Sequence, residues 1–153
     1  MKLYIVVAVI VTLLSITPFR GTDIAKLAPA EVVWLAEEDG QVILMTDTED
    51  VGRGVDVLEA LADMKATATG TIFLDTADYL IVEKGSEKFL DQVADELRPS
   101  CMLCRANQMP DLKEAVTFFA VHKWDVTLRQ WQNDRMSLPL FMEEERRFVW
   151  DES

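Results

Sequence analysis

The sequence is poor in the residues from which chemical sites are built. Its 153 residues include 2 cysteines, 1 histidine and 6 glycines, and the glycines lack the spacing of a dinucleotide or nucleotide phosphate loop. Cys101 and Cys104 form a single CxxC, which supplies fewer ligands than a structural zinc ion takes. With His122 as the one histidine, we predict no catalytic residue, no cofactor and no metal site.

Basic residues are also scarce. The chain has 15 Lys and Arg against 27 Asp and Glu, which gives a formal net charge of −12. Phosphate binding needs concentrated basic side chains that release counterions, so the composition disfavours nucleic acid as a partner. An acidic surface is also repelled by anionic lipid headgroups. The plain interpretation of the charge is solubility.

What the chain does have is enough apolar sequence for one core. Half of its residues are hydrophobic and 27% are charged, and a chain of this length builds one globular core and is too short for two. We expect an appendage at residues 1–19, a single α/β (α+β) domain at residues 22–142 and a charged, aromatic tail at residues 143–153. No internal repeat or low-complexity segment is visible.

The appendage is an apolar run. Residues 3–19 carry no charged side chain and are followed by Arg20, a length that suits a signal peptide or a short membrane anchor. Residues 15–17, Ser-Ile-Thr, fit a signal peptidase site poorly, which favours an uncleaved membrane helix. We expect the domain on the extracytoplasmic side of the cell membrane, held by a single-pass anchor, or secreted if the segment is cleaved.

The domain begins with two β-rich runs at residues 31–35 and 41–46. Asp39-Gly40 between them is a strong turn signal, so the two runs predict a β-hairpin. The first run is continuously apolar rather than alternating, which predicts a strand buried on both faces.

The central unit spans residues 54–85. Apolar residues at helical spacing predict a helix that stops at Gly70; they are Val57, Leu58, Leu61 and Met64. Residues 71–74 and 79–82 then indicate two short strands, or one strand with a bulge, near the centre of the sheet.

Residues 46–54, which precede that helix, allow two interpretations. Gly52-Arg53-Gly54 at the end of this stretch could meet an anion at the helix start. The acidic side chains of Asp47, Glu49 and Asp50 would repel a phosphate, so an acidic surface loop is the favoured alternative.

Three further elements complete the domain. A helix starts at Ser86 and ends before Pro99, residues 100–106 indicate a strand, and Pro110 marks the first turn of a helix over residues 112–121. The order of elements predicts a layered domain in which helices pack on one mixed β-sheet.

The two cysteines leave three interpretations open. Cys101 and Cys104 lie in a strand-like run, where residues three apart point to opposite faces, whereas a thioredoxin-type motif opens a helix. Packing in the core is favoured; a disulfide or metal site outside the membrane is the second interpretation, and thiol–disulfide oxidoreductase activity is the third. His122, beside an apolar helix end, is predicted to interact with the helix C-terminus rather than with a metal.

The C-terminal segment is the best candidate for a partner surface. Four aromatic residues are candidate interface residues, because exposed aromatics form interface hot spots: Trp124, Trp131, Phe148 and Trp150. For Trp124 and Trp131, which recur at helical spacing, packing in the domain's own core is the favoured alternative. For Phe148 and Trp150, which are surrounded by charge, neither interpretation is favoured.

Three stretches of the chain resemble the N-terminal domain of the Ger(x)C family of spore germination proteins. They are DIAKLAPAEVVWLAEEDG at residues 23–40, the block at residues 54–106, and VTLRQWQNDRMSLPLF at residues 126–141. The resemblance covers residues 22–142 and lies in the order and spacing of apolar positions. It includes Leu138-Pro139, which is similar to a Leu-Pro motif of the family.

The resemblance implies a protein that is not an enzyme. Ger(x)C proteins are extracytoplasmic lipoprotein subunits of nutrient germinant receptors in spore-forming Gram-positive bacteria, so it implies an integral membrane protein as partner. Residues 16–18 stand near the place of the family's lipobox cysteine, which excludes lipid anchoring by that route. The family's larger C-terminal portion has no counterpart in this sequence. No residue identifies a small-molecule ligand.

Overall fold

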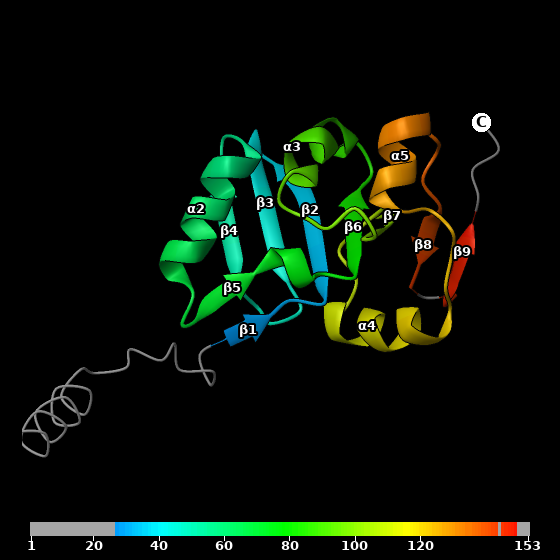
Figure 1. Cartoon of the computed structure of the whole chain (residues 1–153), viewed down its shortest axis with the longest axis horizontal. Helices are drawn as coiled ribbons and strands as arrows, with labels where there is room; N and C mark the ends of the chain where they lie inside the picture. Colours follow the sequence, from blue (N-terminus) through cyan, green and yellow to red (C-terminus); the bar gives the residue numbers. More distant parts are fainter. Residues whose placement is uncertain (1–26, 144, 150–153) are drawn as a thin grey trace, which may run out of the picture.

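The computed structural model describes residues 27–143 and 145–149, and Figure 1 follows the chain through them. The predicted membrane helix at residues 1–19 lies outside the described residues. Within the described ranges, no helix is long and apolar enough to cross a membrane.

Seven strands form one mixed sheet in the order β4-β3-β2-β6-β7-β8-β9. The four middle strands run parallel: β2 (Val32–Glu38), β6 (Tyr79–Glu83), β7 (Met102–Ala106) and β8 (Leu140–Met142). Antiparallel pairing adds β3 (Gln41–Thr46) and β4 (Val51–Gly54) at one edge and β9 (Arg147–Val149) at the other. The predicted class, a single α/β domain with a mixed sheet, is confirmed.

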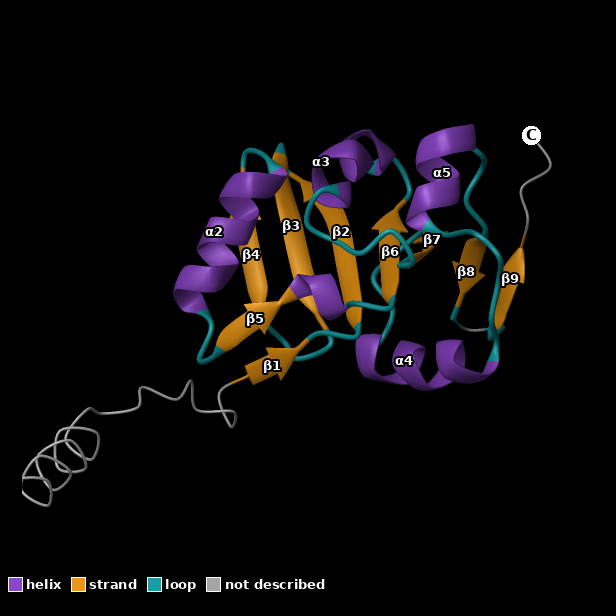
Figure 2. Cartoon of the chain, in the orientation of Figure 1, coloured by secondary structure: helices purple, strands orange, loops and turns teal. Residues whose placement is uncertain are grey.

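Helices cover both faces of the sheet. Three of them share one face, α2 (Val57–Thr67), α3 (Leu90–Ala94) and α5 (Leu128–Asp134), and Figure 2 shows all three in front of the strands. The Val57 amide of α2 donates to the Gln92 side chain of α3, and Arg135, after α5, pairs with Asp91 of α3. These contacts join the three helices into one layer.

The remaining helix, α4 (Leu112–Val121), packs on the opposite face. Its Phe119 ring contacts Tyr79, which pairs in register with Val32. On the other face, Leu35 of β2 pairs in register with Leu44, which pairs with Gly52, and the Cβ position of Gly52 points at α2. Successive side chains of a strand alternate between faces, so Val32 faces away from α2. The sheet is therefore the middle layer of three.

The predicted hairpin is confirmed. β2 and β3 pair antiparallel through a turn at Asp39 and Gly40, whose φ angles are 52° and 78°. Both residues have positive φ, as a two-residue hairpin turn requires. Every residue of the run from Val32 to Ala36 is buried, because helices cover both faces of this central strand.

The structure decides between the two interpretations of residues 71–82. They form two strands separated by a 3₁₀ helix, η2 (Leu74–Thr76). Only the second, β6, lies at the centre of the main sheet. The first, β5 (Thr71–Phe73), pairs parallel with β1 (Leu27–Pro29) in a separate two-stranded sheet. The helix predicted to follow from Ser86 is shorter than expected, a 3₁₀ turn η3 (Glu87–Phe89) and the short α3.

Contact between α2 and β4 corrects two predictions. Gly52 and Gly54 lie in β4, where a Cβ atom on Gly52 would be 2.0 Å from the Ala60 carbonyl oxygen, and one on Gly54 would be 2.4 Å from the Ala60 nitrogen. The glycines therefore allow the helix to lie directly on the strand, and they do not form an anion loop. The acidic part of the predicted surface loop is confirmed, because Asp47, Glu49 and Asp50 lie in the turn between β3 and β4. The buried stripe of α2 also runs through Ala60, while Leu58 is 64% exposed.

The start of α2 is occupied by its own side chains. Asp56 caps the helix by accepting from the Glu59 amide, and the Glu59 carboxylate accepts from the Val55 amide at 2.8 Å. Two carboxylates thus already bind the amides that an anion would need, which gives a second reason against an anion site.

Candidate functional site

A groove of about 720 Å³ runs beside α4, between this helix and the β8–β9 hairpin, and we call it the α4 groove. Its lining from α4 and the residues flanking the helix includes Asp111, Glu114, Phe118, Val121 and His122. The lining from the hairpin consists of Phe141, Glu143 and Arg146. A smaller recess of about 240 Å³ also borders Phe141, next to Asn107 and Gln108.

Aromatic rings form the floor of the α4 groove and join it to the core. The Phe118 and Phe141 ring centroids are 5.4 Å apart, and Phe141 lies 5.0 Å from the buried ring of Phe119. Phe119 also contacts Tyr79 and Trp124 at 5.2 and 4.8 Å. Aromatic pairs at these distances stabilise one another, so the floor is continuous with the aromatic core.

His122 closes the C-terminal end of α4, as predicted. Its amide donates to the Phe118 carbonyl as the helix cap, and its ring stacks on the Phe118 ring with 4.2 Å between centroids. The imidazole therefore lengthens the flat aromatic surface of the groove.

Charged residues of both signs surround the N-terminal end of α4. Lys113 pairs with Glu49 of the β3–β4 turn; this contact lowers the pKa of Glu49 and raises the pKa of Lys113. The Glu143 carboxylate accepts from the Asp111 amide at 2.7 Å. Arg146 reaches towards Glu114 across the α4 groove, with 3.8 Å between Nη2 and Oε2.

Charge is divided unequally along the sheet. Residues 27–99 contain 17 acidic and 5 basic residues and form β1 to β6 with α2 and α3; we call this the acidic half. Residues 100–149 contain 7 of each sign and form β7 to β9 with α4 and α5, the neutral half. The strand order keeps the halves apart, as the colours of Figure 1 show. Most of the α4 groove belongs to the neutral half.

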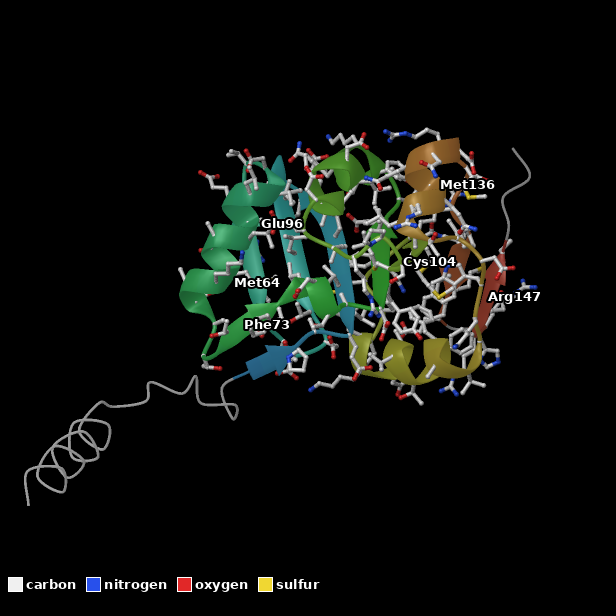
Figure 3. All side chains as sticks on the ribbon, viewed as in Figure 1. Met64, Phe73, Glu96, Cys104, Met136 and Arg147 are labelled. Carbon is white, nitrogen blue, oxygen red and sulfur yellow. The ribbon has the colours of Figure 1, made fainter. Side chains whose placement is uncertain are left out.

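Both cysteines are free thiols in the interior of the domain, and Figure 3 shows Cys104 among the packed side chains of the sheet. Burial raises the pKa of Cys101 to about 12 and the pKa of Cys104 well above its usual value. The reactive form of cysteine is the thiolate, and at neutral pH these thiols are protonated. The placement agrees with core packing, and the structure contains no disulfide between them.

The predicted interface aromatics are placed as follows. Trp124 and Trp131 are 5% and 8% exposed and belong to the core. The Trp124 indole donates to the Leu103 carbonyl at 2.6 Å, and α5 turns Trp131 inwards. Neither is available to a partner, so the interface prediction for these two residues is wrong and the favoured alternative, packing in the domain's own core, is confirmed. The Phe148 side chain and all of Trp150 lie outside the described residues.

The sequence interpretation missed Phe118, Val121 and Arg146. One signal was present: α4 buries Leu112, Ala115 and Phe119, yet its sequence also has apolar residues outside this stripe. A surface helix with one apolar face needs fewer of them, so Phe118 and Val121 indicated a second contact.

Comparison with family models, with curated proteins and with solved structures finds no match to this chain. Among the described residues, no three His, Cys, Asp or Glu side chains are grouped as a metal site would require. The chemistry of the α4 groove is therefore the basis for the interpretation that follows.

Proposed function

We propose that this chain is a non-enzymatic, membrane-associated extracytoplasmic subunit or assembly module, with a role like that of the Ger(x)C proteins. The observation that carries the proposal is the α4 groove, which combines an aromatic floor with a rim of mixed charge. Protein interfaces have this composition, an apolar centre rich in aromatic residues and a polar rim. A groove of this kind suits assembly with another protein.

The N-terminal segment supplies the membrane contact in this proposal. Residues 3–19 are uncharged and apolar, and about 20 such residues span a bilayer as a helix. The Ger(x)C resemblance adds the kind of complex expected, a germinant receptor with an integral membrane partner. The acidic half suits a domain outside the membrane, because anionic headgroups repel it.

Membrane attachment is tested on the full chain in its native cells. Wild type should fractionate with membranes, be cleaved by protease added from outside, and co-purify with an integral membrane protein in mild detergent. Val9→Arg places a charge within the apolar run and should release the chain. Val55→Arg, at a residue 69% exposed in the folded domain, is the matched control and should stay with the membrane. Wild type found wholly in the cytosol contradicts the proposal.

Assembly is tested separately by native electrophoresis of detergent-solubilised membranes. The full chain should migrate in a complex, and Val121→Asp should shift it to lower mass, because a charge in the α4 groove opposes burial. A Val121→Asp chain that migrates with wild type would mean that assembly does not use this groove.

A further inference from the structure

We infer that the α4 groove is occupied by the α4 helix of a second copy of this chain, with the two helices antiparallel across a two-fold axis. The inference rests on the proposed function, since it names the occupant of the proposed assembly surface. A two-fold interface uses the same patch on both copies. The patch must therefore be complementary to itself in shape and in charge.

The shape of the patch meets this requirement. Val121 projects from the last turn of α4 and is 76% exposed. Val121 lies at the rim of the α4 groove, and the hollow that would receive the Val121 of a second copy is the groove floor formed by Phe118 of α4 and Phe141 of β8. Phe118 and Val121 are three residues apart, about 4.5 Å along the helix axis, so projection and hollow are about one turn apart. Antiparallel helices place the projection of each copy over the hollow of the other.

The charges along α4 also favour the antiparallel arrangement. Asp111, Lys113 and Glu114 lie at the N-terminal end of the helix, where Lys113 is paired with Glu49 and the two acidic residues leave an acidic end. The exposed Lys123 follows the cap at the C-terminal end. Antiparallel packing brings Glu114 of each copy towards Lys123 of the other. Parallel packing would instead bring acidic residues together, and like charges across an interface are costly.

The charge of the whole domain decides which face a second copy can use. Each copy has a net charge of −12, and the described part of that charge lies in the acidic half. A two-fold axis near the C-terminal end of α4 brings residues of the neutral halves together, and Glu49, the acidic-half residue that pairs with this helix, is already bound to Lys113 at the other end.

After Val121, the most exposed large apolar residues of the described part of the chain are Val55 and Leu58. They lie beside Asp56 and Glu59 of the acidic half, where a second copy would be repelled. A basic partner would be drawn to that half and away from the α4 groove.

Sedimentation equilibrium of the full chain in density-matched detergent tests the inference. Wild type should form dimers, and Val121→Asp should weaken dimerisation about a hundredfold, because two carboxylates would be buried without partners. Leu58→Asp places the same charge on a residue 64% exposed in the acidic half, and it should dimerise like wild type. Each variant carries the same N-terminal segment, so differences report on the domain.

A charge exchange tests the antiparallel geometry. Glu114→Lys and Lys123→Glu should each weaken dimerisation about tenfold, since each creates two like-charge contacts. An equal mixture of the two variants should restore it, because every contact across the heterodimer then joins opposite charges. Both positions are exposed, so folding should be preserved.

Three results would overturn the inference: a monomeric wild type, a Val121→Asp chain that dimerises like wild type, or a mixture that associates no better than the single variants. A monomeric purified chain that still enters a complex in native membranes, sensitive to Val121→Asp, means a different occupant. In that case the inference fails and the proposed function stands. Loss of membrane attachment, in contrast, contradicts the proposed function alone.

Discussion

The two halves of the sheet meet their helices in different ways. On the acidic half, α2 lies directly on β4 because Gly52 and Gly54 have no side chain. The outer edge of β4 is covered as well, since the Arg53 amide donates to Asp63 and the Val51 carbonyl accepts from Thr67. The helix of the neutral half, α4, instead packs through Phe119 on the rings of Tyr79, Trp124 and Phe141, and a groove remains beside it. Side-chain size at the contact thus determines which surface is closed and which stays open.

The aromatic support of α4 should give the largest effect on stability. Phe119→Ala removes the fully buried ring that contacts Tyr79, Trp124 and Phe141, and it should lower the free energy of unfolding by about 4 kcal/mol. Denaturant unfolding measures the loss. Phe118→Ala, at a half-buried residue, is the comparison, and an equal loss in both would contradict the account of the groove floor.

The close contact between α2 and β4 on the acidic half should affect the free energy of unfolding almost as strongly. Gly52→Ala forces a Cβ atom into the α2 backbone, which should cost about 3 kcal/mol by overpacking. Gly40→Ala is the control, because nothing lies within 4 Å of its added Cβ. Its φ of +78° alone should cost about 1 kcal/mol. Denaturant unfolding measures both losses. An equal loss of unfolding free energy in the two variants would argue against direct contact between α2 and β4.

The buried thiols, near the boundary of the two halves, predict a dependence on alkaline pH. The pKa of Cys101 in the folded protein is about 12, above its usual 9.0. The contribution of the protonated thiol to the free energy of unfolding is therefore complete below pH 9 and is lost as the pH rises towards 12. In that interval stability should fall by about 1.4 kcal/mol per pH unit for this thiol. Cys101→Ala should remove this part of the pH dependence, when the free energy of unfolding is measured from pH 8 to 11. An unchanged slope would mean that the thiol ionises equally in the folded protein.

Changes at the covered edge of β4 should have the smallest effect on the free energy of unfolding. Asp63→Ala removes the acceptor of the Arg53 amide and should cost about 1 kcal/mol. Asp63→Asn keeps an acceptor oxygen and should recover most of the loss. Equal unfolding free energies for Ala and Asn would show that the hydrogen bond does not contribute.

Local signals were sufficient to predict much of the fold. Asp39-Gly40 indicated the hairpin, and the helix predicted for residues 112–121 has the observed bounds of α4. The class of fold followed from the order of such elements. These features depend on turn chemistry and periodicity, which lie within a few residues of one another.

Features that depend on distant partners could not be predicted. Trp124 has helical spacing to Leu128, yet α5 starts only at Leu128 because Thr127 and Gln130 form a capping box. The Gly-Arg-Gly sequence could not reveal that α2 packs on it. The α4 groove is formed by the hairpin of β8 and β9, so its lining from Phe141 to Arg146 was not visible from the helix alone.

Carboxylate footprinting of the full chain tests the central claim, that the open neutral half is the surface used for assembly. Labelling in native membranes is compared with labelling after dispersal in strong detergent that leaves the domain folded. The account predicts protection of Glu114 and Glu143 in membranes, with equal labelling of Glu38 and Asp56 in both conditions, because they lie on the acidic half. Equal labelling of Glu114 in both conditions, or protection confined to the acidic half, would contradict it.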